Sequence, residues 1–106
     1  MVIILLPNGT EWFKANWAFR QLAADVDSRC PDHDIRESLE RAEALGVLDL
    51  KNMGDQKLVV RLMGALRDVA QDTVDGVLSG WRPEDRSGAQ MYRDAMVELA
   101  AAIDKS

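Results

Sequence analysis

A chain of 106 residues that is 47% hydrophobic and 29% charged can bury one sizeable core, so we expect a single folded domain over residues 1–106. Its 13 Lys and Arg against 18 Asp and Glu give a net charge of −5, and no segment is basic, which argues against nucleic acid and anionic membranes as partners. The single cysteine excludes an intramolecular disulfide, and no apolar run is long enough for a signal peptide or a membrane span, so we expect a cytoplasmic protein.

The first element is a short apolar strand. Val2–Leu6 reads VIILL, and the turn signal Pro7-Asn8-Gly9 follows it directly. A strand cannot stand alone, because its backbone N–H and C=O groups need a neighbouring strand. The partner of Val2–Leu6 therefore decides the fold.

A helix is predicted next, over about residues 11–29, with Thr10 as its N-cap and Pro31 after its end. Its apolar residues recur at alternating spacings of three and four, which places them on one helix face (Trp12, Ala15, Phe19, Leu22 and Val26). Phe13 and Trp17 form a second aromatic ridge, which is either exposed or buried against a partner.

A second helix is predicted to begin at Asp34, because an acidic cap followed three residues later by Glu37 resembles a capping box. It turns three apolar residues inward (Ile35, Leu39 and Ala42), and Gly46 is predicted to end it.

Residues 47–62 allow two interpretations. As a hairpin with its loop at 52–56, they alternate apolar and polar residues on both arms (Leu48 and Leu50; Leu58, Val60 and Leu62). As a helix from Asp55, they extend the apolar stripe of the next helix, and Val2–Leu6 then pairs with another molecule or is not a strand. We favour the hairpin, because it gives Val2–Leu6 its partners.

Two further helices are predicted over about residues 64–79 and 85–104, separated by the loop SGWRPED. With the hairpin, the chain is α+β in the order β-α-α-β-β-α-α, with a three-stranded antiparallel sheet and four helices. The alternative is an all-α four-helix bundle. If Val2–Leu6 presents an exposed edge, a homodimer through a continued sheet becomes an option, whereas a central position in the sheet removes it.

No motif predicts a reaction. Cys30, Asp32, His33 and Asp34 are all potential metal ligands, but a structural zinc site requires more Cys and His than this chain has. A nucleophilic pair of Cys30 and His33 would need converging side chains, an orienting third group and an oxyanion site, and a turn of three residues that contains Pro31 does not ensure that the two side chains converge. The sequence has no glycine-rich phosphate loop. We therefore expect a protein that is not an enzyme and that holds no metal or cofactor.

The partner-binding residues predicted from the sequence are five. Asp68, Asp72 and Asp75 form one column on a helix, which suits a basic patch on another protein. Trp81 and Arg82, in the loop between the last two helices, are of the residue types enriched in interface hot spots. The predicted function is a protein-binding module of the inhibitor, immunity or adaptor type that acts through an acidic surface.

Residues 35–50, IRESLERAEALGVLDL, resemble the recognition helix and following wing of GntR-type winged-helix regulators. Seven positions match that pattern by residue type (Ile35, Arg36, Glu37, Leu39, Glu43, Gly46 and Leu48), and QLAADV at 21–26 resembles the preceding helix. The resemblance covers about residues 21–62. It implies an alternative function, a winged-helix transcriptional regulator that dimerises through its C-terminal helices. A recognition helix that carries Glu37, Glu40 and Glu43 is poorly suited to phosphate contacts, so this function ranks second.

Overall fold

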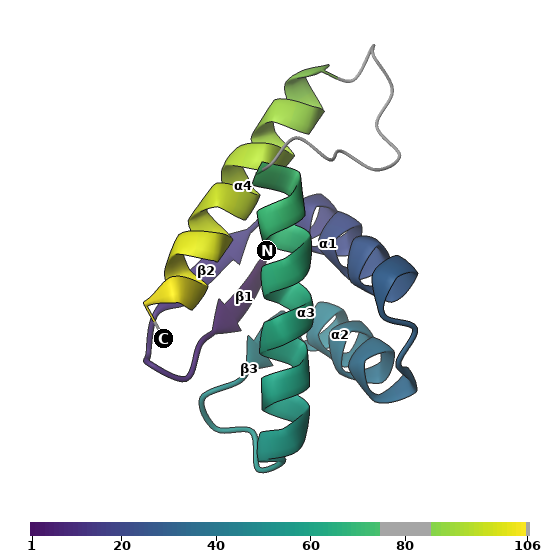
Figure 1. Ribbon diagram of the computed structural model, residues 1–106, viewed down its shortest axis with the longest axis vertical. Helices are drawn as coiled ribbons and strands as arrows, with labels where there is room; N and C mark the ends of the chain where they lie inside the picture. Colours follow the sequence, from purple (N-terminus) through teal and green to yellow (C-terminus); the bar gives the residue numbers. More distant parts are fainter. Residues whose placement is uncertain (75–85, 106) are drawn as a thin grey trace.

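The computed structural model describes residues 1–74 and 86–105 of the chain (Figure 1). Within these ranges the elements are β1 (Val2–Leu5), β2 (Glu11–Lys14), α1 (Asn16–Arg29), α2 (His33–Leu45), β3 (Val47–Asp49), α3 (Gln56–Val74) and α4 (Arg86–Asp104). The α+β class with four helices and three strands among the described residues is as predicted. The order is β-β-α-α-β-α-α, which differs from the predicted one.

The three strands form one mixed sheet in the order β2-β1-β3. β1 pairs with β2 in the antiparallel sense, with Ile4 opposite Trp12, and with β3 in the parallel sense, with Ile4 opposite Leu48. The prediction of a purely antiparallel sheet was therefore wrong, and so was the all-α alternative. Because β1 is the central strand, a dimer through its edge is excluded.

The helix predicted from residue 11 begins only at Asn16, since Glu11–Lys14 form β2. Gly9 adopts a left-handed φ of +88° that reverses the chain, and the Leu6 N–H donates to the Thr10 carbonyl at 2.9 Å. Thr10 therefore belongs to a hairpin turn and is not a helix cap. The error arose because Trp12 is buried in the strand as it would be in a helix, so the apolar spacing did not distinguish the two.

The hairpin predicted over 47–62 was also wrong, because only Val47–Asp49 are extended and α3 begins at Gln56. The helical alternative from Asp55 describes this stretch, since Asp55 Oδ1 accepts the Leu58 N–H at 3.1 Å. The sequence interpretation assumed that a helix here would leave β1 without a partner. Instead, β2 and the short β3 supply its two neighbours.

Helix α2 is capped two residues earlier than predicted. Asp32, rather than Asp34, is its N-cap, and Oδ1 of Asp32 accepts the N–H groups of Asp34 at 2.9 Å and Ile35 at 3.3 Å. Gly46 ends the helix with a φ of +83°, as predicted. Helix α4 also agrees with its prediction, whereas the predicted end of the preceding helix at Ser79 lies outside the described residues.

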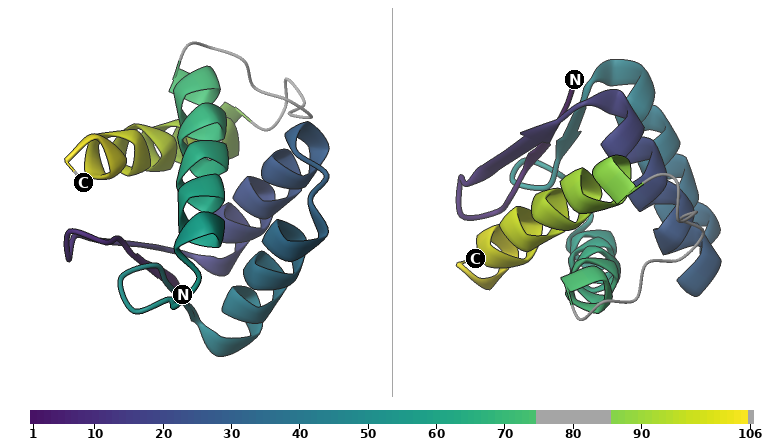
Figure 2. Two further views of the ribbon diagram at one scale, coloured as in Figure 1. Left: turned by 60° about the horizontal axis from the view of Figure 1, so that its bottom comes forward. Right: turned by 90° about the horizontal axis from the view of Figure 1, so that it is seen from above.

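The helices gather on one side of the sheet and enclose one core (Figure 2). Two long-range hydrogen bonds join its parts: the Trp12 indole N–H donates to the Ala95 carbonyl at 2.9 Å, and the Tyr92 hydroxyl donates to Asp25 at 2.9 Å. Together they fasten α4 to β2 and to α1. Among the described residues, none of the helices has the length and apolarity required to cross a membrane.

Candidate protein-binding surface

One face of the sheet is left uncovered by the described helices. Along β1 the side chains alternate: Val2 and Ile4 are fully buried in the core, whereas Ile3 and Leu5 are only half-buried on the opposite face. The same alternation in β2 and β3 buries Trp12 and Leu48 against the helices. We call the opposite side of the sheet the open face.

Three apolar side chains form a row across this open face. Ile3 of β1 lies opposite Phe13 of β2 and opposite Val47 of β3. Phe13 is 52% exposed and Val47 is 38% exposed, although both belong to regular strands. A Phe-Ile-Val row on an exposed sheet surface is a contiguous apolar patch of the kind that marks interaction sites.

The next row across the open face is acidic at both ends. Leu5 lies between Glu11 on β2 and Asp49 on β3. The Asp49 carboxylate accepts the backbone N–H of Asn52 at 3.0 Å and its side-chain N–H at 2.9 Å. These hydrogen bonds favour the ionised form and hold the pKa of Asp49 below its usual value, so this carboxylate is charged at neutral pH.

A cation lies at the same end of the sheet. A Cβ placed on Gly9, in the β1–β2 turn, would be 3.9 Å from the Lys51 ammonium. Two further cations lie near these carboxylates, since Arg41 lines the same hollow as Asp49 and Lys105 lines a hollow with Glu11 and Phe13.

The apolar row continues beyond the edge of β3 into a hollow of about 290 Å³. Val47 lines both the row and the hollow, and apolar side chains from α2, β3 and the following loop contribute to its walls (Ala42, Leu45, Leu48 and Met53). Leu45, the last residue of α2, is 69% exposed. The apolar surface thus extends from β2 across the sheet to the end of α2.

The column of aspartates predicted from the sequence is only partly available. Asp68 is exposed on α3. Asp72 forms an ion pair with Arg29 of α1, so its charge is balanced within the protein. Asp75, Trp81 and Arg82 lie outside the described residues.

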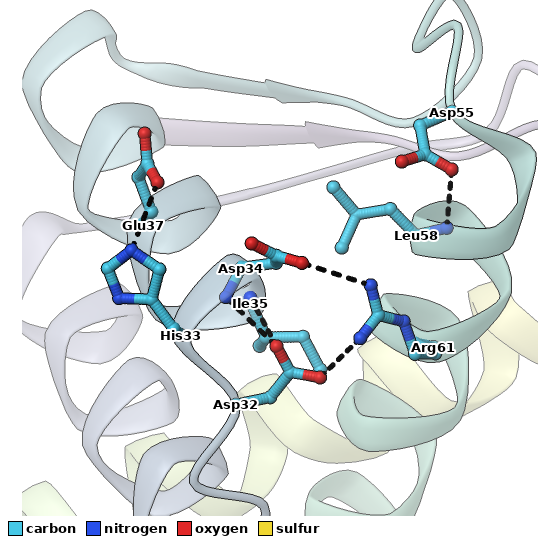
Figure 3. Close-up of polar contacts among 8 residues, drawn as sticks. All are labelled: Asp32, His33, Asp34, Ile35, Glu37, Asp55, Leu58 and Arg61. Atoms are coloured by element: carbon cyan, nitrogen blue, oxygen red, sulfur yellow. Dashed lines mark hydrogen bonds and ion pairs between the residues drawn. The ribbon is translucent and has the colours of Figure 1, made fainter.

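The motif CPDHD connects helices. Asp32 caps α2 and accepts a hydrogen bond from Arg61 of α3 at 2.5 Å, and Arg61 also reaches Asp34 at 3.4 Å (Figure 3). The guanidinium thus bridges the start of α2 to α3. Asp32 and Asp34 therefore have structural contacts that account for their presence.

Cys30 and His33 have no described contact with each other. Cys30 is exposed at the end of α1, where its N–H donates to the Val26 carbonyl. The His33 side chain is 85% exposed and lies 3.6 Å from the Glu37 carboxylate. Within residues 1–74 and 86–105, no group of three His, Cys, Asp or Glu side chains is placed to hold a metal ion.

No protein-family model matches this chain, and no curated protein or solved structure is significantly similar to it.

Sequence reasoning missed the open face, although β1 carried a signal for it. A strand with one face in water alternates apolar and polar residues, whereas VIILL is apolar on both faces, as in strands covered on both sides. The helices of the described residues cover only one of those faces. Ile3 and Leu5 are therefore the residues that the sequence predicts to be buried and that the structure leaves only partly buried.

Proposed function

We propose that this protein is a non-enzymatic protein-binding module of the inhibitor, immunity or adaptor type, and that it binds its partner through the open face of the sheet. The observation that carries this proposal is the mismatch at β1. Its sequence is that of a strand buried on both faces, but only one face is covered by the helices of the described residues. A partner that covers Ile3 and Leu5 would complete the burial.

The composition of the open face supports a protein partner. Phe13, a large aromatic residue in the outer strand, is of a type enriched at the cores of protein interfaces. Removing apolar surface from water contributes about 25 cal/mol per Å², so the exposed row favours association with another apolar surface. Glu11 and Asp49 supply the acidic part of the surface, and Asp68 adds an exposed carboxylate elsewhere. We therefore infer a partner that bears basic groups beside an apolar patch.

The regulator alternative has no observation in its favour. A winged-helix regulator requires a hairpin after the recognition helix, and here α3 begins at Gln56, in the middle of that stretch.

The proposal is tested with a matched pair of substitutions. Phe13→Asp places a charge on the open face, and Val60→Asp places one on α3, where Val60 is 70% exposed. Val60→Asp should keep the stability of the wild type within about 0.5 kcal/mol, because the site is exposed on a helix. Phe13→Asp should lose about 1–2 kcal/mol, because Asp is disfavoured in strands and about half of the Phe13 side chain is buried, so capture is compared at a temperature at which circular dichroism shows both variants folded. In quantitative affinity purification from extracts of the source cells, a protein held by wild type and by Val60→Asp should be lost with Phe13→Asp.

Retention of every captured protein by Phe13→Asp, at wild-type levels, would remove the open face as the binding site. Parallel loss with both variants would mean that the effect is not specific to this face.

A further inference from the structure

We infer that the partner attaches by adding an extended segment of its chain to the sheet, as a fourth strand along the outer edge of β2. β2 is an outer strand of the sheet, and within residues 1–74 and 86–105 no strand lies beyond it. This inference rests on the proposed function and specifies which element of the partner makes the contact and where the contact begins.

The hydrogen bonds between β1 and β3 show which way the backbone groups of β1 point. The Ile3 N–H donates to the Gly46 carbonyl at 3.0 Å. Two residues further along, the Leu5 carbonyl accepts the Leu50 N–H at 2.9 Å. Ile3 and Leu5 therefore direct their backbone groups toward β3, and the residue between them directs its own toward β2.

The backbone of β2 presents hydrogen-bonding groups to its outer edge. Ile4 of β1 faces β2, and Trp12 lies directly opposite it in the antiparallel register. Residues opposite each other in an antiparallel pair turn their backbone groups both inward or both outward, and the direction alternates along the strand. Trp12 therefore faces β1, whereas Glu11 and Phe13 on either side of it direct their N–H and C=O groups away from the sheet.

An extended backbone matches these outward groups, and a helix does not. Glu11 and Phe13 are two residues apart, so their outward groups repeat at about 7 Å along the edge. A second strand repeats its own N–H and C=O groups at the same interval. An α-helix uses these groups internally and has none to offer along its length. Directed main-chain hydrogen bonds, rather than a large buried area, hold a strand of this kind.

A groove of about 430 Å³ accompanies this edge, and we call it the β2 groove. Its first wall is Thr10 and the whole of Glu11–Lys14, and its second wall is the end of α4. Ala101 and Ala102 contribute small side chains to that second wall. Figure 1 shows α4 beside β2, where the ion pair between Lys14 and Glu98 joins the two elements. The β2 groove thus has the position that an added strand requires.

The side chains on the two faces of the sheet specify those of the added segment. A residue opposite Trp12 turns its side chain to the helix side, where α4 offers Ala101 and Ala102. A residue opposite Phe13 turns its side chain to the open face and lengthens the apolar row there. An apolar residue suits both positions, so the segment carries neighbouring apolar residues such as valine or isoleucine.

The β2 groove carries charges of both signs. Lys14 and Glu98 form an ion pair with each other. Glu11 and Lys105 both line the groove and have opposite charges. The backbone and the apolar side chains, rather than charge, therefore select the segment at this edge.

The opposite edge of the sheet is a poorer site. β3 has three residues, whereas β2 has four. The Asp49 carboxylate of β3 holds the backbone N–H of Asn52 at 3.0 Å, so the loop that follows β3 turns back beside this strand. α2 and that loop both line the hollow next to β3. An added strand therefore has a longer and less enclosed edge at β2.

A second copy of the chain fits the edge of β2 less well than an extended segment. Two paired β2 strands would lie about 4.8 Å apart. Each copy holds α4 beside β2 through the hydrogen bond from Trp12 to Ala95, and antiparallel pairing brings both α4 helices to the same side of the sheet. Packed helices need about 8–10 Å between their axes. A segment that carries no flanking helix avoids this conflict.

The test uses a capped peptide of about six residues that alternates valine and threonine, both of which favour strands. Two derivatives carry N-methyl groups, one on its valines and the other on its threonines. Since only alternate N–H groups of a strand face its neighbour, one of these derivatives loses its hydrogen bonds to β2 and the other keeps them. Binding is followed by NMR shifts in the isotopically labelled protein.

We expect the parent peptide to bind with a Kd on the order of 10⁻⁴ M, because so short an edge belongs to the weak class of interfaces. Binding should shift the backbone amide resonances of Glu11 and Phe13 and leave that of Val60 unchanged. One N-methylated derivative should bind at least about tenfold more weakly, and the other should keep the parent affinity within about twofold.

Glu11→Pro and Glu11→Ala form a matched pair of protein variants. Both remove the carboxylate, but only proline removes the outward N–H. Proline is accepted at the first residue of an edge strand because that N–H is not used within the sheet. Circular dichroism establishes that both variants are folded. Glu11→Pro should bind the peptide about fivefold more weakly than Glu11→Ala, as expected for one lost hydrogen bond, and should capture less of the native partner.

The other outcomes overturn the inference. Equal affinities of the two N-methylated derivatives, or no peptide binding at all, would exclude an added strand. Full capture of the native partner by Glu11→Pro, when Phe13→Asp loses it, would exclude the edge of β2 but keep the proposed function. If Phe13→Asp retains the native partner, the proposed function itself fails. Concentration-dependent shifts at Glu11 and Phe13 without peptide would assign the edge to a second copy.

Discussion

Trp12 offers the most direct test of the sheet assignment. Its side chain is 3% exposed, and its indole N–H donates to the Ala95 carbonyl of α4 at 2.9 Å. Trp12→Phe removes this buried hydrogen bond, which contributes about 1 kcal/mol. It also removes about 40 Å² of buried ring surface, worth about 1 kcal/mol at 25 cal/mol per Å². We therefore expect the free energy of unfolding to fall by about 2 kcal/mol.

The next residue supplies the matched control for Trp12. Phe13 lies on the open face and is 52% exposed, so Phe13→Leu should change the free energy of unfolding by less than about 0.5 kcal/mol. Both variants are compared by urea unfolding followed by far-ultraviolet circular dichroism. For a domain of about 100 residues, the loss expected for Trp12→Phe corresponds to a Tm lower by about 8–16 °C.

The reasoning fails if the two substitutions cost the same. Equal, large losses would mean that Phe13 is as buried as Trp12, so that the sheet has no open face. A loss below about 0.5 kcal/mol for Trp12→Phe would mean that β2 is not fastened to α4 through this indole.

Three further predictions concern individual side chains. Burial and the nearby Asp25 raise the pKa of Tyr92, the single tyrosine of the sequence. The stabilisation of the folded state by the neutral hydroxyl is therefore complete below about pH 10, the unfolded pKa, and is lost as the pH rises further. Tyrosinate absorbance should appear only together with unfolding, and its appearance in the folded protein near pH 10 would contradict the burial. Asp32→Ala should lower the free energy of unfolding by about 1–2 kcal/mol through loss of the helix cap, whereas Asp34→Ala should lower it by less than about 0.5 kcal/mol. Both losses are measured by urea unfolding, and a larger loss for Asp34→Ala than for Asp32→Ala would identify Asp34 as the cap. Asn52→Ala should raise the pKa of Asp49 toward its usual value, as followed by carboxyl NMR titration, and an unchanged titration would mean that Asn52 does not hold this carboxylate. The lowered pKa stabilises the folded state at a pH above the unfolded pKa of Asp49, and this stabilisation is lost as the pH falls through the folded pKa.

The open face and the acidic column predicted from the sequence make separate demands on a partner. The open face needs an apolar surface on the partner, whereas Asp68 needs a basic group. Asp68→Asn is therefore a useful companion to Phe13→Asp. Loss of partner with Asp68→Asn would extend the interface onto α3, and retention would confine it to the sheet.

The sequence by itself determined most of the helices and the central strand. Apolar residues at three- and four-residue spacing predicted α2 and α4, and Gly46 marked the end of α2, because a left-handed residue there favours glycine. The run VIILL predicted β1 and, through it, a sheet. These features are local, since the geometry of a helix or a strand imposes its own period on the residues that must be buried.

The tertiary structure alone decided which strands pair and which face stays open. Trp12 fits the apolar spacing of a helix and is also buried in β2. The local pattern therefore predicted that Trp12 is buried, but it did not distinguish a helix from a strand. The parallel pairing of β1 with β3 depends on α2 carrying the chain back to the same end of the sheet, over about 40 residues. Ile3 and Phe13 became a candidate surface only because the described helices pack on the opposite face, and that choice depends on contacts distant in sequence.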